Sequence, residues 1–319
     1  MRLASILPLF FVFSAFAAEL VEVRKIWDQG AHNAFTDLIR YKGRWYCTFR
    51  EAEKHVSPDG ALRVLESRDG REWKAVGLVA SATGDLRDPK LSITPEGRLM
   101  LTAASALRQP ASARHQSMAW FSSDGKKWSE PMNIGEPNFW LWRVSWNRDT
   151  GLSAGYSTAE DRFVRLYSGR EGQNFTPIVE RLFERDYPNE SSILFTEDGT
   201  ALCLLRRDRG SSTAQLGRAA PPYREWTWKD LGVRVGGPHM IRLPDKRLIA
   251  VVRLYDNEVR TSVCQLDPEA GVLTELLPLP SGGDTSYAGL VWHQNLLWVS
   301  YYSSHEGKAS IYLAKVRLE

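Results

Sequence analysis

The chain has 319 residues, of which 43% are hydrophobic and 25% charged, and its net charge is +3. These values are ordinary for a globular protein, and so small a positive charge gives no support for nucleic-acid binding. The sequence contains no Gly-rich phosphate loop, no HExxH and no CxxC, so we expect no nucleotide or other cofactor and no metal.

The chain begins with a positively charged residue, Arg2, followed by an apolar run over residues 4–18. Small residues at Ala15 and Ala17 have the spacing of a cleavage site, so residues 1–17 are predicted to be a signal peptide. The run falls short of the roughly 20 residues that cross a bilayer. We therefore expect a secreted or periplasmic monomer whose mature chain, residues 18–319, has no membrane span.

Six segments repeat one pattern, an apolar strand, a tight turn and a second apolar strand, about every fifty residues. They begin at His32, Arg87, Leu141, Asn189, Gly236 and Thr285, with turns at Gly43, Gly97, Gly151, Gly199, Lys246 and Asn295. A third and a fourth strand follow each pair except the last, which is followed by a third strand alone. Four short strands per repeat are typical of a propeller blade, so the sequence predicts an all-β, six-bladed β-propeller as a single domain.

Residues 20–27 precede the first repeat and have the character of a strand, while the last repeat lacks its fourth strand. We expect this segment to complete the last blade and close the ring, which hides two sheet edges. Aromatic residues at the third turns, Trp73, Trp128 and Phe175, are expected to pack between blades. The three cysteines, Cys47, Cys203 and Cys264, are too few for a disulfide framework and are expected to be buried free thiols.

The repeat offset gathers polar residues at one end of the hairpins. Arg50, Arg206 and Arg253 each lie seven residues after their turns. Glu190 and Tyr287 lie nine and eight residues before theirs. In an antiparallel pair these two offsets meet at the same end.

Further residues fall on this rim. Arg87 and Asp88 open the second repeat, where they either bind substrate or pair with each other, and Trp142 opens the third. His239 and His305 lack a partner at ligand spacing, so we interpret them as structural or substrate-contacting residues.

Several of these segments resemble the sialidase (neuraminidase) superfamily. The turns Ser-x-Asp-Gly-x-x-Trp at Ser67 and Ser122 resemble its Asp-box, the stretch from Asn189-Glu190 to Arg206 resembles its Asn-Glu … Asp-Gly … Arg segment, and Ser286-Tyr287-Ala288-Gly289-Leu290 resembles its nucleophile segment.

This resemblance implies a retaining exo-glycosidase, with a glycan as its partner, in which Tyr287 is the nucleophile and Glu190 its base. Arg206 would belong to the arginine triad that holds the substrate carboxylate. The family's spacing favours Arg260 as the third arginine, and the repeat offset favours Arg253.

The family's acid is an aspartate in the loop after the second strand of the first blade, here residues 51–60. Asp59 is our prediction, with Glu51, Glu53 and His55 as alternatives.

The chain departs from the family at the start of the first blade, where Asn33-Ala34-Phe35 stands in place of Arg-Ile-Pro. Arg50 is the residue that can substitute for the missing arginine. A neutral phenol nucleophile suits a substrate that carries its own carboxylate, and it needs an adjacent base because its ordinary pKa is about 10.

Two other hypotheses stay open at this point. The same fold can cleave a neutral or uronic sugar with paired carboxylates, for which Asp37, Asp88 and Glu190 are candidates. It can also be a non-catalytic propeller that binds a glycan or a protein.

Overall fold

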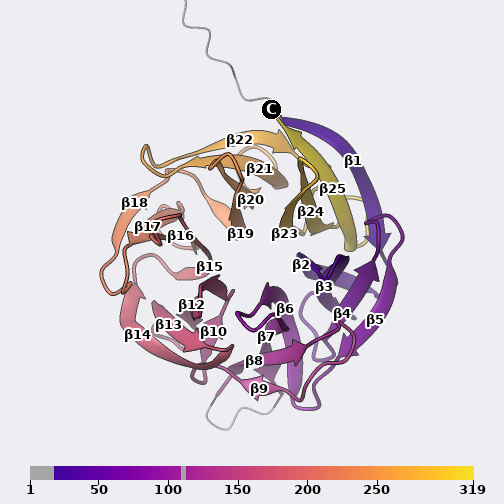
Figure 1. Cartoon of the computed structure of the whole chain (residues 1–319), viewed down its shortest axis with the longest axis horizontal. Helices are drawn as coiled ribbons and strands as arrows, with labels where there is room; N and C mark the ends of the chain where they lie inside the picture. Colours follow the sequence, from indigo (N-terminus) through magenta and orange to yellow (C-terminus); the bar gives the residue numbers. More distant parts are fainter. Residues whose placement is uncertain (1–17, 109–112) are drawn as a thin grey trace, which may run out of the picture.

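The computed structural model describes residues 18–108 and 113–319, and Figure 1 shows the described residues as a ring of six sheets. The predicted signal peptide lies outside the described residues. Within them every regular element is a β-strand, arranged as six antiparallel sheets around one axis, so the predicted six-bladed β-propeller is confirmed.

Each of the first three blades begins with a strand near the axis and ends at the perimeter. Blade 1 consists of β2 (His32–Tyr41), β3 (Arg44–Ala52), β4 (Ala61–Ser67) and β5 (Lys74–Val79). Blade 2 consists of β6 (Gly84–Ile93), β7 (Leu99–Leu107), β8 (His115–Ser122) and β9 (Met132–Asn133). Blade 3 has a divided inner strand and consists of β10 (Phe139–Leu141), β11 (Ser145–Asn147), β12 (Thr150–Ser157), β13 (Val164–Arg170) and β14 (Gln173–Phe183).

The remaining blades follow the same order. Blade 4 consists of β15 (Pro188–Phe195), β16 (Ala201–Arg207), β17 (Gln215–Ala219) and β18 (Thr227–Asp230). Blade 5 consists of β19 (Val235–Arg242), β20 (Leu248–Leu254), β21 (Arg260–Asp267) and β22 (Val272–Pro278). Blade 6 consists of β23 (Thr285–His293), β24 (Leu296–Ser303), β25 (Ser310–Leu318) and, from the other end of the chain, β1 (Ala18–Trp27).

The ring closes as predicted, because β1 pairs antiparallel with β25 along its length, from Ala18 opposite Leu318 to Trp27 opposite Ile311. In Figure 1 the indigo β1 lies beside the yellow β25 at the perimeter. The strand from the start of the described chain therefore covers an edge that the last blade would otherwise expose.

One predicted turn is misplaced. We expected the turn of blade 3 at Gly151, but Gly151 lies within β12 and pairs with Trp146 of β11. The turn is formed by Arg148 and Asp149, and Arg148 takes the left-handed conformation with a φ of 53°. A non-glycine residue thus occupies the position for which glycine is the usual marker.

A hydrophobic cluster fills each interface between neighbouring blades. At the interface between blades 6 and 1, the rings of Trp45 and Trp298 stack at 4.3 Å, and Trp73 packs against the same cluster. Trp128 packs at the interface between blades 1 and 2, and Phe175 at the next one. The prediction that the turn aromatics pack between blades is confirmed.

Glycines at the third turns allow the blades to approach this closely. A Cβ atom at Gly70 would lie 2.4 Å from the Trp298 ring, and one at Gly125 would lie 2.3 Å from the Tyr46 ring. In both turns the serine hydroxyl, of Ser67 or Ser122, accepts a hydrogen bond from the glycine N–H. Each turn therefore presents bare backbone to an aromatic ring of the preceding blade.

The three cysteines are buried and free, as predicted. No helix among residues 18–108 and 113–319 is long and apolar enough to cross a membrane.

Candidate active site

The innermost ladder of every blade is interrupted at an equivalent point, by a β-bulge in five blades and by a break in blade 3. In blades 1, 2, 4, 5 and 6 the register between the first two strands shifts once. At that point two consecutive residues of the inner strand lie opposite one residue of the second strand. In blade 3 the inner strand breaks altogether between Leu141 and Ser145. The residues in these interruptions include Phe35, Asp88, Trp142, Glu190, Gly237 and Tyr287.

Bulges of this kind redirect a side chain out of its regular alternation and are common beside active sites. Phe35, Asp88, Gly237 and Tyr287 have φ values of 63°, 52°, 54° and 53°. A left-handed backbone is uncommon outside glycine and costs free energy at each non-glycine position. The six blades thus gather residues from six distant segments around the axis.

Tyr287, Glu190 and Arg206 form a hydrogen-bonded group, which we call the central cluster. The Tyr287 hydroxyl donates to Glu190 Oε1 over 2.5 Å, and Arg206 Nη1 lies 2.7 Å from the same carboxylate oxygen. Arg206 also donates to the Tyr287 oxygen over 3.1 Å. The second carboxylate oxygen, Glu190 Oε2, accepts the Gly237 N–H over 2.8 Å.

The surroundings fix the charges of this cluster. Burial alone raises the pKa of Glu190, but the charge of Arg206 and the hydrogen bonds from Tyr287, Arg206 and Gly237 outweigh it, and the pKa falls below its ordinary value. Burial and the charge of Glu190 raise the pKa of Tyr287 well above its ordinary value. Near neutral pH the cluster therefore holds a carboxylate, a neutral phenol and a guanidinium.

Arg253 joins the central cluster, and Arg260 does not. The Arg253 guanidinium lies over the Tyr287 ring at 5.3 Å, and its Nε donates to the Thr285 carbonyl over 2.8 Å. Arg260 instead pairs with Glu275 on the outer strand β22 at 2.6 Å. The repeat offset thus identified the arginine that contacts Tyr287, and the family's spacing did not.

Arg50, the proposed substitute for the missing arginine, is fully buried, and each of its three nitrogens donates to the protein. Its Nε donates to Asp85 over 2.8 Å, and its terminal nitrogens donate to the carbonyls of Lys54 and Ser57. The structure thus does not support substrate binding by Arg50, because the side chain is buried and its hydrogen bonds hold the loop of residues 51–60 in place.

Phe35 is the last residue of Asn33-Ala34-Phe35, the segment that stands where the resemblance led us to expect Arg-Ile-Pro. Its ring meets the Tyr287 ring at 5.1 Å and the Tyr302 ring at 5.5 Å. Arg87 lies over the Phe35 ring at 5.2 Å and pairs with Asp85 at 3.3 Å rather than with Asp88. The local Arg87–Asp88 ion pair that we considered is therefore not formed.

The four candidate acids of blade 1 lie in different environments. Asp59 is exposed and accepts the Glu53 N–H over 3.0 Å, and hydrogen bonding, chiefly from Ser57, lowers its pKa. Glu51 is bound to Trp27 and Arg63 on the outer side of the strand pair. The Glu53 side chain is exposed, whereas His55 packs edge-on against Phe35 at 5.2 Å.

Asp88 is the second carboxyl group near the central cluster. It is 6% exposed, its Oδ1 is buried with no hydrogen-bond partner among the described residues, and burial raises its pKa to about 6. The negative charge of Glu190 adds to this rise, and the charges of Lys90 and Arg87 oppose it. Two carboxyl groups with different proton affinities therefore share the region around Tyr287, an arrangement typical of acid–base chemistry.

Trp142, which we predicted to bind substrate, is 2% exposed. It therefore lines the site and presents no exposed ring face to a ligand. Its ring packs against Tyr287 at 5.7 Å, and Lys90 lies over it at 4.9 Å.

His239 is buried beneath the cluster, and burial lowers its pKa well below the ordinary value. Its Nδ1 donates to the Ala288 carbonyl over 2.9 Å, which fixes its tautomer and supports the strand that carries Tyr287.

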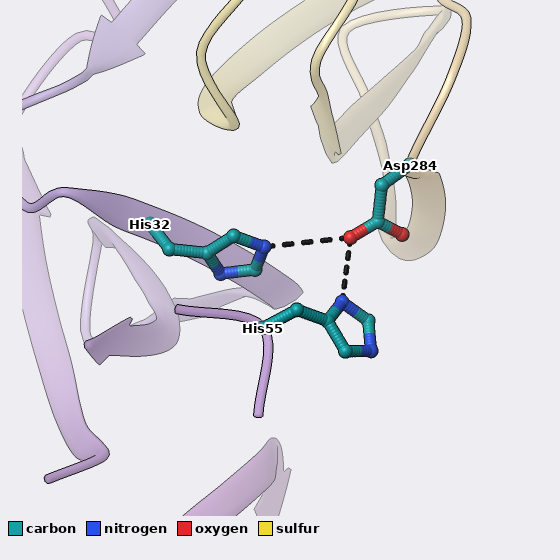
Figure 2. A group of neighbouring side chains, drawn as sticks. All are labelled: His32, His55 and Asp284. Carbon is teal, nitrogen blue, oxygen red and sulfur yellow. Dashed lines mark hydrogen bonds and ion pairs between the residues drawn. The ribbon is translucent and has the colours of Figure 1, made fainter. Parts of the chain in front are cut away.

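One group of side chains was not singled out by the sequence. His55 Nδ1 lies 2.6 Å from Asp284 Oδ2, and His32 Nε2 lies 3.4 Å from the same oxygen (Figure 2). The other oxygen, Asp284 Oδ1, accepts the Tyr302 hydroxyl over 2.5 Å and lies 3.4 Å from Arg253. This group, the His–His–Asp cluster, thus borders the central cluster through Arg253.

No sequence spacing marks the His–His–Asp cluster, because His32 opens an inner strand, His55 lies in a loop and Asp284 precedes the last blade. Burial works against ionisation of Asp284, but the hydrogen bonds from His32, His55 and Tyr302 hold its pKa well below the usual range. His305, by contrast, bonds to Ser303 at 2.9 Å and stays outside this cluster.

No family model matches the chain, and no curated protein matches it significantly. Solved structures do resemble it. A Dyadobacter fermentans protein of unknown function aligns over 95% of this chain and 100% of its own, with a TM-score of 0.83 and 19% identity.

Two glycosidases also align. A Penicillium chrysogenum α-L-arabinanase in complex with arabinobiose covers 92% of this chain and 98% of its own, with a TM-score of 0.70 and 13% identity. Trypanosoma rangeli sialidase aligns over 90% of this chain but only 55% of its own, with a TM-score of 0.69 and 11% identity. At these identities the likeness establishes a shared propeller fold.

Proposed function

We propose that the protein is a retaining exo-glycoside hydrolase of the sialidase type, which releases a terminal sialic acid or a related acidic sugar from glycans. The observation that carries the proposal is the 2.5 Å hydrogen bond from the Tyr287 hydroxyl to Glu190, with Arg206 in contact with both. A phenol needs such a base to act as a nucleophile, and a tyrosine nucleophile is the known exception among glycosidases for sialic acid. The resemblance to arabinanase and sialidase folds agrees with glycoside hydrolysis as the reaction class.

In the first step the Tyr287 oxygen attacks the anomeric carbon as the bond to the leaving oxygen breaks. The phenol proton passes to Glu190, and a second group donates a proton to the leaving oxygen. In the second step water attacks the anomeric carbon, the bond to Tyr287 breaks, and Glu190 returns the proton to the phenol. The same acid–base group takes the proton from the water, so the sugar leaves with its configuration retained.

We assign the proton donor to Asp88 in preference to Asp59. A general acid must be protonated at the working pH, and the pKa of Asp88 is raised to about 6, whereas that of Asp59 is lowered. Asp88 Oδ1 also has no protein partner among the described residues, so no other side chain competes for its proton.

The preference for an acidic sugar rests on charge. Arg206 and Arg253 place two guanidinium groups beside Tyr287, and their positive charge attracts a substrate carboxylate. A neutral nucleophile also avoids the repulsion that a carboxylate nucleophile would meet. The predicted signal peptide, finally, is the basis for proposing that the protein acts outside the cytoplasm.

A second candidate is hydrolysis of a neutral or uronic sugar with paired carboxylates. The missing arginine favours it, because a neutral residue, Asn33, takes the place of a cation and Arg50 is committed to the protein. Of the three carboxylates considered for this mechanism, Asp37 is bound by Arg143 at 2.9 Å and by the N–H groups of Leu38 and Leu91. Asp88 and Glu190 would therefore be the pair.

The test is hydrolysis of fluorogenic glycosides of sialic acid, other ulosonic acids, uronic acids and neutral pentoses, by the wild type and by Tyr287→Phe in parallel. We expect release from an acidic sugar, with kcat reduced at least about a hundredfold in Tyr287→Phe because the nucleophile is lost. Turnover of only a neutral sugar would favour the second candidate. Binding without turnover would favour a non-catalytic glycan-binding propeller.

A further inference from the structure

The His–His–Asp cluster has the composition of a metal site. Two imidazole rings, from His32 and His55, direct one nitrogen each at a single oxygen of Asp284, as Figure 2 shows. These three ligand atoms lie within 4.8 Å of one another. Two histidines and one carboxylate are a ligand set that binds zinc and related divalent ions while leaving positions open.

The three side chains differ in how firmly they are held. His32 opens the inner strand β2, and its side chain is 14% exposed, whereas His55 belongs to the loop of residues 53–60 and its side chain is 48% exposed. Metal–ligand bonds of about 2.0–2.2 Å require the His55 ring to withdraw from its 2.6 Å hydrogen bond. The exposed loop allows that movement and gives an ion access from solvent.

The surroundings support Asp284 as a ligand. Its second oxygen accepts the Tyr302 hydroxyl over 2.5 Å, and Arg253 lies 3.4 Å away. Hydrogen bonds of this kind orient ligating carboxylates and tune their metal affinity.

We propose that His32, His55 and Asp284 bind one divalent transition-metal ion of the zinc class, with open coordination positions at the edge of the central cluster. This proposal stands whether or not the protein is a glycosidase. It replaces our expectation from the sequence that the protein binds no metal. An ion there would add positive charge at the start of blade 1, where Asn33 stands in place of the arginine that the resemblance led us to expect.

The experiment uses tag-free protein, dialysed against EDTA and titrated with Co²⁺, whose visible absorption reports coordination by nitrogen and oxygen ligands. Zn²⁺ is then added as a competitor. We expect one Co²⁺ per chain, displaced by Zn²⁺. His55→Ala should weaken the Co²⁺ affinity at least about tenfold, and Tyr302→Phe should weaken it about 10- to 100-fold through Asp284.

His305→Ala is the matched control, because His305 is a part-exposed histidine that lies 3.8 Å from a different carboxylate, Glu306. It should bind Co²⁺ like the wild type. Thermal melts of the ion-free variants establish that each one folds. Absence of stoichiometric Co²⁺ binding to the wild type, or binding to His55→Ala as tight as to the wild type, would overturn the proposal.

Discussion

Tyr287 and Glu190 come from blades 6 and 4, and the residue between them in space is a glycine. Gly237 of blade 5 donates its N–H to Glu190, and a Cβ atom at this position would lie 2.9 Å from the Tyr287 ring. The absence of a side chain here therefore lets the phenol reach across blade 5 to the carboxylate. The contact between Tyr287 and Glu190 thus depends on blade 5 as well as on blades 4 and 6, which supply the two side chains.

The pKa values around Tyr287 lead to a prediction about pH. Glu190 must be ionised as the base, and its pKa lies below the ordinary 4.5, so activity should fall only at strongly acidic pH. Asp88 must be protonated as the acid, and its pKa is about 6, so activity should also fall as pH rises through about 6. The profile of kcat/KM against pH should be bell-shaped with an acidic optimum.

Asp88→Asn and Asp59→Asn distinguish the two candidate donors in the same measurement. Asp88→Asn should lower kcat about 10²- to 10⁴-fold and abolish the fall near pH 6, because the amide cannot supply the proton. Asp59→Asn should keep both limbs of the profile. The reverse pattern would assign the proton donor to Asp59, as the sequence first predicted.

At the scale of the element, the bulge in the inner strand is the feature that builds the site. In a regular strand the side chains alternate between two faces, so neighbouring positions cannot all point to one axis. The interruption in each blade frees residues such as Asp88 and Tyr287 from this alternation. Five bulges and the break in blade 3 lie at equivalent points of the inner strands, which explains why the candidate residues share one region.

Gly237→Ala tests this element directly. The methyl group would collide with Tyr287, and the φ of 54° would be strained, so we expect kcat to fall at least about tenfold with a loss of about 1–2 kcal/mol in stability. Steady-state kinetics and urea denaturation measure both effects.

Gly97→Ala is the control for Gly237→Ala, because Gly97 has a φ of 76° but no atom within 4 Å of the added Cβ. It should lose similar stability while keeping full activity. Equal kinetic loss in both variants would mean that strain, and not contact with Tyr287, is responsible.

The repeat pattern in the sequence predicted the strand pairs but not the bulges. It therefore placed some of the candidate site residues correctly and not others. The repeat offset placed Glu190, Arg206, Arg253 and Tyr287 on one rim, and the structure brings these four together. Arg50 shares the same offset, yet Asp85 and two loop carbonyls take its donors. A repeat pattern gives the place of a residue in its blade, but it carries no information about which loop packs against that residue.

At the scale of the whole molecule, one strand, β1, closes the six blades into a ring. β1 supplies the outer edge of blade 6, and its side chains Leu20 and Val23 pack against the cluster between blades 5 and 6. The composition of residues 20–27 and the missing fourth strand of the last repeat made this closure predictable. The His–His–Asp cluster could not be predicted in this way, because it joins two residues of blade 1 to a residue that precedes blade 6.

Deleting residues 1–27 should therefore destabilise the whole ring, by on the order of several kcal/mol, because it removes apolar contacts and exposes the edge of β25. A chain lacking only residues 1–17, which keeps all of β1, is the control. Thermal unfolding and light scattering compare the two. Equal melting temperatures would show that β1 contributes nothing to closure.

The most direct test of the account is the identity of the covalent intermediate. The protein is incubated with the fluorinated analogue, bearing fluorine next to the anomeric carbon, of the sugar that is released from the glycoside panel. Mass spectrometry of the intact chain and of its peptides then locates the adduct. We predict one sugar per chain, attached to Tyr287. An adduct on Glu190 or Asp88, or turnover with inverted configuration and no adduct, would contradict the tyrosine mechanism.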